Sequence, residues 1–186
     1  MARLVYSVIA SLDGYVADPD GRFDWAAPDE EVHAFVNDQE RGIGTYLYGR
    51  RMYETMRVWE TDPSLAASGP ETKDYAQVWQ AADKVVYSTT LTRPDTSRTR
   101  VEPVFEPEQV RRLKDQARAD LSVGGPTLAG AALRAGLVDE LQVYQVPVVV
   151  GGGLAWLPDG LALPLELTDV HRFAGGTVHL TYAVSS

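Results

Sequence analysis

An alternation of apolar strands with helix-like segments constrains the fold of this chain more than any other feature. Buried-strand patterns recur at 3–11, 44–49, 83–88, 120–125 and 140–150, and amphipathic or polar segments separate them. Successive strands that are joined through helices run parallel, and the helices then cover both faces of the sheet. The sequence therefore predicts an α/β fold, a three-layer α-β-α sandwich with a mixed, mostly parallel central sheet.

The last part of the chain follows a different pattern. Two strand-like segments, 164–173 and 177–184, are joined by Gly175-Gly176, and such a pair between strands is typical of a hairpin turn. This predicts an antiparallel hairpin at the C-terminal end of the sheet. Because neither an internal repeat nor a linker interrupts the 186 residues, we expect a single domain spanning 1–186.

Helices are expected between the strands. Pro28 is placed to open the first helix, with Asp29, Glu30 and Glu31 near the positive end of its dipole. Gly136 is placed to end the last one. Further predictions are helices at 50–56, 71–82 and 107–119, a loop at 57–70 and a short strand near Val101.

Charge and composition exclude several classes of function. The chain carries 26 Asp and Glu against 17 Lys and Arg, so neither nucleic acid nor an anionic membrane is expected as a partner. It has no cysteine and three scattered histidines, so no metal site is predicted. No apolar segment approaches the ~20 residues that cross a bilayer, and the first residues are typical of a strand, not a signal peptide. We expect a cytoplasmic protein that acts on a small molecule.

Residues suited to phosphate binding follow three of the predicted strands. They are Gly49-Arg50-Arg51, Ser88-Thr89-Thr90 and Gly124-Gly125-Pro126-Thr127. Ligands of open parallel sheets bind beyond the carboxyl ends of the strands, where glycine admits a phosphate and helix N-termini offer free N–H groups. Each group alone is explained by a turn, a solvated arginine pair or a strand end. Their placement on three strand ends favours a dinucleotide that carries an additional phosphate.

Several motifs in a fixed order give the chain a family resemblance. The segments "SLDGYVA", "YLYGRRMYE", "KVVYSTTL", "SVGGPTLAGAALRAGLVDEL" and "PVVVGGG" precede a closing "GGTVHLTY". In this order they resemble the dihydrofolate reductase-like superfamily, most closely the reductase domain of the bifunctional riboflavin-biosynthesis deaminase-reductase and its stand-alone bacterial relatives. The resemblance covers nearly the whole chain and implies that NADPH is the hydride donor.

The resemblance also implies where the cofactor lies. It puts 49–51 at the phosphates, 88–90 at the adenosine ribose and its 2′-phosphate, and 124–127 at the pyrophosphate. Segment 13–24 is implied to form a mobile loop over the nicotinamide. The full set of cofactor residues implied in this way is Ile9, Ala10, Val16, Gly49, Arg50, Arg51, Ser88, Thr89, Thr90, Gly124, Gly125, Pro126 and Thr127.

Two positions depart from the pattern of the relatives. Met52 stands where they usually carry Thr, which removes a hydroxyl contact to phosphate. Thr89 stands where many carry Arg, which weakens the expected preference for NADPH and leaves NADH open as the cofactor. Arg50, Arg51 or Arg93 are the candidates to compensate.

Reduction of a C=N bond needs a proton on the nitrogen, from a positioned acid or from water. The resemblance implies a carboxylate on the helix after the loop, and two alignments of "WAAPDEEVHAF" select Glu30 and Glu31 respectively. The helix dipole alone also explains acids in a first turn. Trp25 and Phe35 are expected to contact the substrate.

The sequence supports three functional hypotheses. The first is an NAD(P)H-dependent reductase of a small heterocycle such as a pterin. The second is the 5-amino-6-(5-phosphoribosylamino)uracil reductase of riboflavin biosynthesis, whose phosphate needs a basic cluster that the loop, with Arg22 alone, does not offer. The third is a ligand-binding protein that kept the fold without the chemistry. A homodimer is the simplest way to cover the long apolar strands near the C-terminus.

Overall fold

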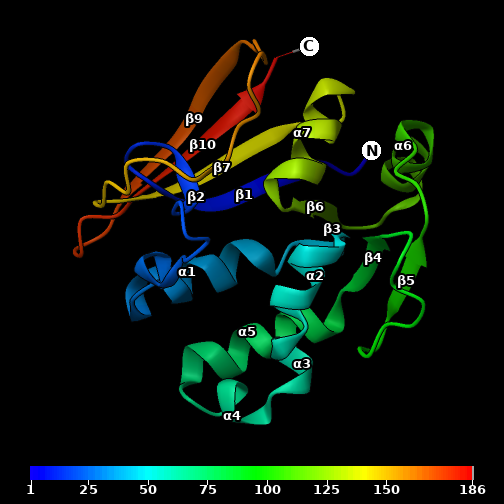
Figure 1. Cartoon of the computed structure of the whole chain (residues 1–186), viewed down its shortest axis with the longest axis horizontal. Coiled ribbons are helices and arrows are strands. Elements are labelled where there is room, and N and C mark those ends of the chain that lie inside the picture. Colours follow the sequence, from blue (N-terminus) through cyan, green and yellow to red (C-terminus); the bar gives the residue numbers. More distant parts are fainter. Residues whose placement is uncertain (186) are drawn as a thin grey trace.

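A central eight-stranded sheet organises the computed structural model, which describes residues 1–185 (Figure 1). The strand order is β5-β4-β3-β6-β1-β7-β10-β9, with parallel pairing up to β7 and antiparallel pairing of β10 with both neighbours. This confirms the predicted sheet and its C-terminal hairpin. The strands are β1 (Leu4–Ser11), β3 (Ile43–Gly49), β4 (Asp83–Tyr87), β5 (Thr99–Glu102), β6 (Asp120–Gly124), β7 (Glu140–Val146), β9 (Leu165–Arg172) and β10 (Val178–Val184).

The parallel strands all end at one edge of the sheet, which we call the carboxyl edge, and begin at the other, the amino edge. The register places Tyr48 beside Gly124 and Gly49 beside Tyr87. The three glycine and hydroxyl groups singled out in the sequence therefore follow neighbouring strands β6, β3 and β4. Their predicted placement at one edge is confirmed.

Helices cover both faces of the sheet, as expected for this fold. Figure 1 shows α6 and α7 on one face and α1 to α5 on the other. No helix among residues 1–185 is long and apolar enough to cross a membrane. The helices are α1 (Glu30–Glu40), α2 (Arg50–Met56), α3 (Val58–Thr61), α4 (Pro63–Ala66), α5 (Pro70–Ala81), α6 (Pro107–Gln116) and α7 (Pro126–Arg134).

The two faces of the sheet have cores of different composition. Under α6 and α7 the core is mostly aliphatic, and the small residues Ala129, Gly130 and Ala132 let α7 pack closely on the sheet. Under α2 and α5 it is aromatic, with Tyr48 and Trp79 at its centre. The polar tips of these rings are satisfied internally, since Trp79 Nε1 donates to Tyr48 Oη at 3.1 Å.

Segment 57–70, predicted as a loop, is instead largely helical. Asp62 caps α4 by accepting a hydrogen bond from Ser64 N at 3.0 Å, and Pro63 occupies the first helical position. The prediction failed because two four-residue helices are too short to show a period. Helix α5 buries Trp79 completely in the aromatic core.

Three predicted boundaries are wrong by a few residues. Helix α1 begins at Glu30, not at Pro28, because the Asp29 side chain accepts from Val32 N at 2.9 Å and so acts as the N-cap. Helix α6 ends at Gln116, since Ala117 is extended. Strand β7 ends at Val146, before Pro147, which has no N–H for the ladder.

The loop after β1 carries two elements that the sequence did not predict. Strand β2 (Tyr15–Ala17) pairs with β8 (Leu154–Ala155) as a separate two-stranded sheet, and a short 3₁₀ helix, η1 (Asp24–Ala26), follows. Gly153 makes this pairing possible, because a methyl group there would lie 2.1 Å from the Ala17 carbonyl oxygen. Segment 13–24 thus has defined structure.

Candidate functional site

The two glycines at the end of β6 have different structural requirements. A methyl group on Gly124 would lie 2.7 Å from the Tyr48 ring, so this glycine makes room for a core tyrosine on β3. Gly125 has φ +89°, a conformation that favours glycine, and it precedes Pro126 at the start of α7. The strand therefore turns sharply into the helix at the carboxyl edge.

Two helices begin side by side at this edge without a side-chain cap. Gly49 is the N-cap of α2 and Gly125 is the N-cap of α7, and neither helix receives a capping hydrogen bond from a side chain. Their first N–H groups are therefore free to bind an anion. A methyl group on Gly49 would meet no atom within 4 Å, so the space over this backbone is open.

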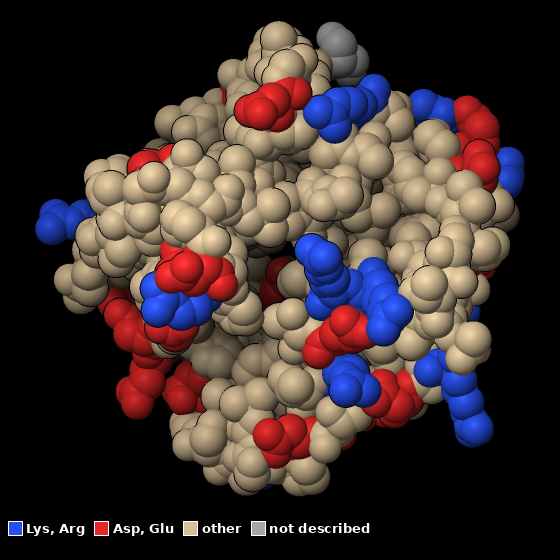
Figure 2. Space-filling view, viewed as in Figure 1, with Lys and Arg blue, Asp and Glu red and all other residues tan. Residues whose placement is uncertain are grey.

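Arginines stand at the first two positions of α2, where the helix dipole disfavours a cation. Arg50 donates from Nη1 to Thr90 Oγ1 at 2.7 Å and from Nε to Glu54 at 2.7 Å. Both Arg50 and Arg51 are exposed. Figure 2 shows basic side chains gathered over α2 beside a hollow in this face of the molecule. The ion pair with Glu54, one turn along the helix, accounts for Arg50, whereas no such contact within residues 1–185 accounts for the Arg51 side chain, which favours a role of Arg51 in binding.

The segment after β4 forms a tight turn around a hydroxyl. Ser88 Oγ accepts hydrogen bonds from Thr90 N at 3.2 Å and Leu91 N at 3.0 Å. Thr89 and Thr90 are exposed beyond it. Because Arg50 bonds to Thr90, the turn and the start of α2 form one continuous polar surface.

Met52 lies between the two helix starts. Methyl groups built on Gly124 and Gly125 would lie 3.2 and 3.3 Å from its Cγ and Cβ. The side chain therefore packs against the backbone of the β6–α7 turn. It offers no hydroxyl, so an anion here would bind through backbone N–H groups.

Asp13 fastens the loop after β1 to the loop after β7. Its carboxylate accepts hydrogen bonds from Val150 N at 3.2 Å and Gly151 N at 2.7 Å. Hydrogen bonds from Ser11 and these backbone groups hold the pKa of Asp13 below its usual range. Two more backbone bonds, Leu12 N to Val148 O and Trp156 N to Gly14 O, complete the attachment.

The residues assigned to the nicotinamide side lie at the end of β1 and on β2. Ala10 is buried, whereas Ile9 and Val16 are half-buried. Ile9 packs against the cluster of Val32, Tyr144 and Phe173 under α1. These positions border the carboxyl edge on the side away from β4.

The two candidate acids on α1 differ in their contacts. Glu31 Oε2 accepts a hydrogen bond from Ala174 N at 3.0 Å, which ties the start of α1 to the β9–β10 turn. Glu30 makes no side-chain hydrogen bond within residues 1–185. Both side chains are exposed. The structure thus gives Glu31 a structural contact and leaves Glu30 available.

The two aromatic residues assigned to the substrate lie in different settings. Trp25, in η1, is half-buried and donates from Nε1 to Arg22 O at 3.2 Å. Phe35 lies in an aromatic cluster under α1, stacked on His171 with ring centroids 4.8 Å apart. Phe35 also contacts Phe173 and His179. The structure does not bring Trp25 into this cluster.

Like Phe173, His179 is a buried member of that cluster. It is 1% exposed, and neither ring nitrogen has a hydrogen-bond partner within the described residues. Burial lowers the pKa of His179 to about 4, so the ring is neutral at pH 7. His171 and His179 thus pack as structural side chains on the terminal strands.

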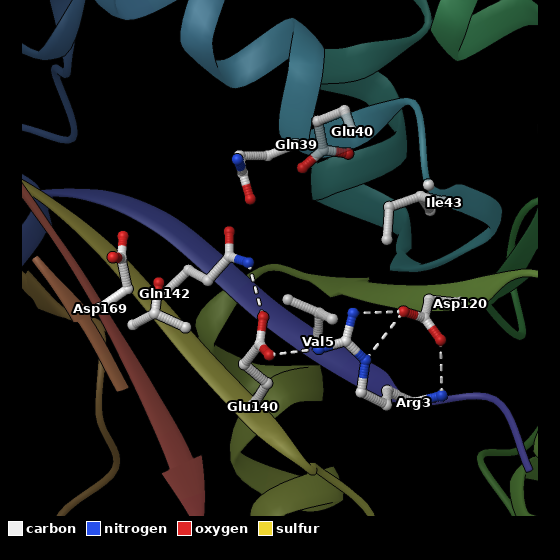
Figure 3. Close-up of a pocket in the computed structure, with 11 residues that line it drawn as sticks. Arg3, Val5, Gln39, Glu40, Ile43, Asp120, Glu140, Gln142 and Asp169 are labelled. Carbon is white, nitrogen blue, oxygen red and sulfur yellow. Dashed lines mark hydrogen bonds and ion pairs between the residues drawn. The ribbon is translucent and has the colours of Figure 1, made fainter. Parts of the chain in front are cut away.

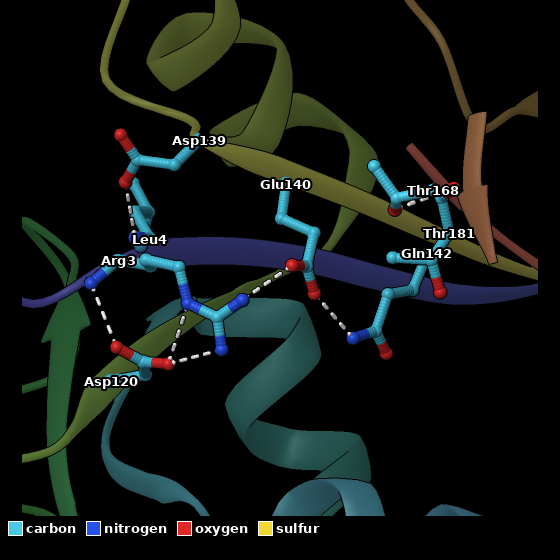
Figure 4. A network of polar contacts seen from close by, with 8 residues as sticks. All are labelled: Arg3, Leu4, Asp120, Asp139, Glu140, Gln142, Thr168 and Thr181. Atoms are coloured by element: carbon cyan, nitrogen blue, oxygen red, sulfur yellow. Dashed lines mark hydrogen bonds and ion pairs between the residues drawn. The ribbon is translucent and has the colours of Figure 1, made fainter. Parts of the chain in front are cut away.

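A polar network at the amino edge was missed in the sequence. Arg3 donates from Nε and Nη2 to Asp120 and from Nη1 to Glu140, at 2.6 to 2.9 Å (Figure 4). Nearby, burial raises the pKa of Glu40 to about 7, and a hydrogen bond from Tyr46 opposes that rise. Arg3 lies more than a hundred positions from Asp120 and from Glu140, so no local motif in the sequence indicates these ion pairs.

Comparison with known proteins identifies the family. The model of the RibD C-terminal domain matches residues 2–179. The chain belongs to this family. Within residues 1–185, no group of three or more His, Asp or Glu side chains could hold a metal ion.

Two curated relatives illustrate the range of this RibD-like family. YyaP of Bacillus subtilis is 26% identical over 184 residues, 97% of this chain and 94% of that protein. The riboflavin biosynthesis protein RibD of Mycobacterium tuberculosis is 28% identical over 165 residues, 86% of this chain but 46% of that protein. The chain thus corresponds to under half of that longer relative.

Solved structures share the fold. A putative riboflavin biosynthesis protein from Shewanella has a TM-score of 0.76 at 20% identity, with both chains fully covered. A deaminase/5-amino-6-(5-phosphoribosylamino)uracil reductase from Thermotoga maritima has a TM-score of 0.66 at 16% identity over 99% of this chain and 57% of that one. The RibD C-terminal domain is an NADPH-dependent reductase, and family membership makes this chain an oxidoreductase of that class.

Proposed function

We propose that this RibD-family protein binds NADPH across the carboxyl edge and reduces a small, flat heterocycle of the pterin or folate type. The observation that carries the proposal is the pair of uncapped helix starts at Gly49 and Gly125 on neighbouring strands. Free N–H groups, open space over Gly49 and two arginines fit the phosphates of a dinucleotide. NADPH supplies the hydride when bound. The proposal places the protein in the cytoplasm.

Each group at the edge has a separate task in this proposal. The N–H groups of Gly49 and of the first turn of α7 bind phosphate oxygens, and Thr127 follows Pro126 as the first residue of α7 with an N–H. The Arg51 side chain makes no hydrogen bond within residues 1–185 and is exposed, so it can turn to a 2′-phosphate beside Ser88 and Thr90. This contact selects NADPH over NADH.

Of the two acids, we assign proton delivery to Glu30. Glu31 accepts a hydrogen bond from Ala174 N, whereas the Glu30 side chain makes none within residues 1–185. Glu30 shares a helix face with His33, one turn along, and His33 packs against Trp59 and Tyr75. This face of α1 is turned towards α3 and α5, away from the β9–β10 hairpin. Glu31, in this account, positions the helix.

Assays on two variants test the assignment. Glu30→Gln is expected to lower kcat at neutral pH by about 10²-fold, the usual contribution of a general acid, with the Kd for NADPH unchanged. Glu31→Gln is expected to lower thermal stability and leave kcat within a few fold of the original. Equal turnover by the Glu30 variant and the original protein contradicts the assignment without affecting the cofactor proposal.

The riboflavin-pathway pyrimidine is the second candidate substrate. The family match and the reductase activity in the name of the Thermotoga protein favour it. Its ribose phosphate requires a free cation near β2, but Arg22 is already paired with Asp18 and Asp20. Turnover of this pyrimidine alongside dihydropterin and dihydrofolate, each with NADPH and with NADH, separates the candidates. Cofactor binding with no turnover of any of them supports a binding protein instead.

A homodimer through β9 is also proposed. This edge strand exposes Leu165, Leu167 and Val170 by 40%, 51% and 55%. An antiparallel copy of β9 can place Leu167 opposite Val170 in both directions, as two-fold symmetry requires. Light scattering should give twice the 20.4 kDa monomer mass, and Val170→Lys should restore the monomer. A monomeric original protein contradicts this part of the proposal.

A further inference from the structure

A cavity of about 280 Å³ lies at the amino edge, away from the proposed cofactor site (Figure 3). The last turn of α1, with Gln39 and Glu40, forms one side, and β1, β7 and β10 form the floor. Unlike the sheet beneath the N-terminal half of α1, which is aromatic, this floor is polar. Polar residues at such depth require partners.

Two largely buried residues on the floor carry oxygens that face the cavity and lack such partners within residues 1–185. Gln142 is 7% exposed and donates from Nε2 to Glu140 Oε1 at 2.7 Å, which fixes its amide orientation because a carboxylate can only accept. Its Oε1 then points towards α1 and has no hydrogen bond within residues 1–185 (Figure 3). Thr181 is 9% exposed, lines the cavity and likewise makes no hydrogen bond through its hydroxyl within those residues.

The charge of the lining is negative. Arg3 is its one cation, and Asp120 and Glu140 take up three of its N–H-bearing nitrogens. Asp169 adds a carboxylate, and Glu40, whose pKa is raised by burial to about 7, adds a carboxyl group that is partly ionised at neutral pH; neither is paired with a cation within residues 1–185. The cavity therefore presents unfilled acceptors and surplus negative charge, and its donors are already in use.

We propose that this cavity binds a small organic cation rich in N–H donors, of the guanidinium or amine class. A planar guanidinium can donate to a carboxylate in a bidentate way and still reach the oxygens of Gln142 and Thr181. The same sheet thus carries an acceptor-rich site at one edge and a donor-rich site at the other. The proposal is independent of NADPH binding.

Calorimetric titration with two matched probes tests the proposal. Butylguanidinium and N-butylurea have the same shape, but only the first is charged. Butylguanidinium should bind saturably at 0.15 M salt, and N-butylurea should bind at least about tenfold more weakly, as expected when a charged hydrogen bond is lost. Equal affinity for the two probes, or no binding of butylguanidinium at ~10 mM, overturns the proposal.

Three variants locate the binding. Thr181→Val and Glu40→Gln should each weaken butylguanidinium binding by about tenfold. Thr177→Val is the matched control, because Thr177 is 7% exposed and does not line the cavity, and it should bind as the original protein does. Far-ultraviolet circular dichroism verifies folding of each variant. Binding that is unchanged in both cavity variants places the probe elsewhere on the acidic surface and overturns the proposal.

Discussion

The amino and carboxyl edges of the sheet differ in how their polar groups are paired, although the same strands form both. At the amino edge, charged side chains at the starts of β1, β6 and β7 and on α6 form ion pairs: Arg3 with Asp120 and Glu140, and Lys114 with Asp139. At the carboxyl edge, β3 and β6 end in glycines that start helices and leave N–H groups free. Paired charges thus stabilise the fold at the amino edge, whereas at the carboxyl edge backbone N–H groups without a side-chain cap form a binding site.

The largest effect is expected from breaking the ion pair at the amino edge. Lys114 is 5% exposed and donates to Leu137 O at 2.8 Å, beside Asp139, which also accepts from Leu4 N at 2.6 Å. Asp139→Ala leaves a buried ammonium without its carboxylate and should cost about 3 kcal/mol in urea unfolding. Asp38→Ala, which removes the exposed partner of Arg41, should cost under about 0.5 kcal/mol. Similar losses of unfolding free energy in the two variants would show that the buried ion pair stabilises the fold no more than an exposed one does.

The carboxyl edge is expected to respond in binding and not in stability. Gly49→Val fills the open space above the backbone and should raise the Kd for NADPH about thirtyfold, roughly 2 kcal/mol. Gly69→Val is the matched control, because Gly69 is also an extended N-cap residue without a side-chain cap. Fluorescence titration gives the affinities. If both variants bind NADPH as the original protein does, phosphate does not approach Gly49.

Glu40, at the amino edge, is expected to make the stability of the protein depend on pH. Its folded pKa of about 7 exceeds the ordinary value of 4.5, so the protonated form stabilises the fold below pH 4.5 and this contribution fades as pH rises to 7. Glu40→Gln keeps an acceptor for Tyr46 and removes the titration. Relative to the original protein, it should gain about 1–2 kcal/mol between pH 4.5 and 7.5. A pH-independent difference contradicts the buried, protonated state.

The smallest expected effect comes from His179, which lies on β10 beside Tyr144, towards the carboxyl end of β7. Its folded pKa of about 4 lies below the ordinary 6.5, so its contribution to stability is full above pH 6.5 and is lost as pH falls to 4. His179→Phe keeps the packing with Phe35 and removes two unpartnered nitrogens. It should raise stability by about 1 kcal/mol at pH 7, and more at pH 4.5. Destabilisation at both pH values would reveal a partner for the imidazole.

Much of the carboxyl edge could be predicted from sequence because its signals are local. The sequence indicates where the chain turns and where a helix begins, because two strands are followed directly by Gly49-Arg50-Arg51 and by Gly124-Gly125-Pro126. The reason for Gly124 was not local, since it depends on the Tyr48 ring from the neighbouring strand. Helices α3 and α4 were not predicted because each has only four residues, which is too short to show the periodicity of a helix.

The amino edge could not be predicted, because its contacts join distant parts of the chain. Nothing near Arg3 in sequence indicates Asp120 or Glu140, and nothing near Gln142 indicates the last turn of α1. The two acids of α1 were an intermediate case. The sequence selected Glu30 and Glu31 together, and only the position of the hairpin turn at Ala174 distinguishes them.

Amide-resolved nuclear magnetic resonance during a titration with NADPH tests the central claim most directly. The account predicts saturable shifts of the Gly49, Gly125 and Thr127 amides, larger than those of any amide at the amino edge, and weaker effects with NADH. No saturable shift at high micromolar NADPH, or shifts centred on Arg3 and Gln142, would contradict the assignment of the cofactor to the carboxyl edge.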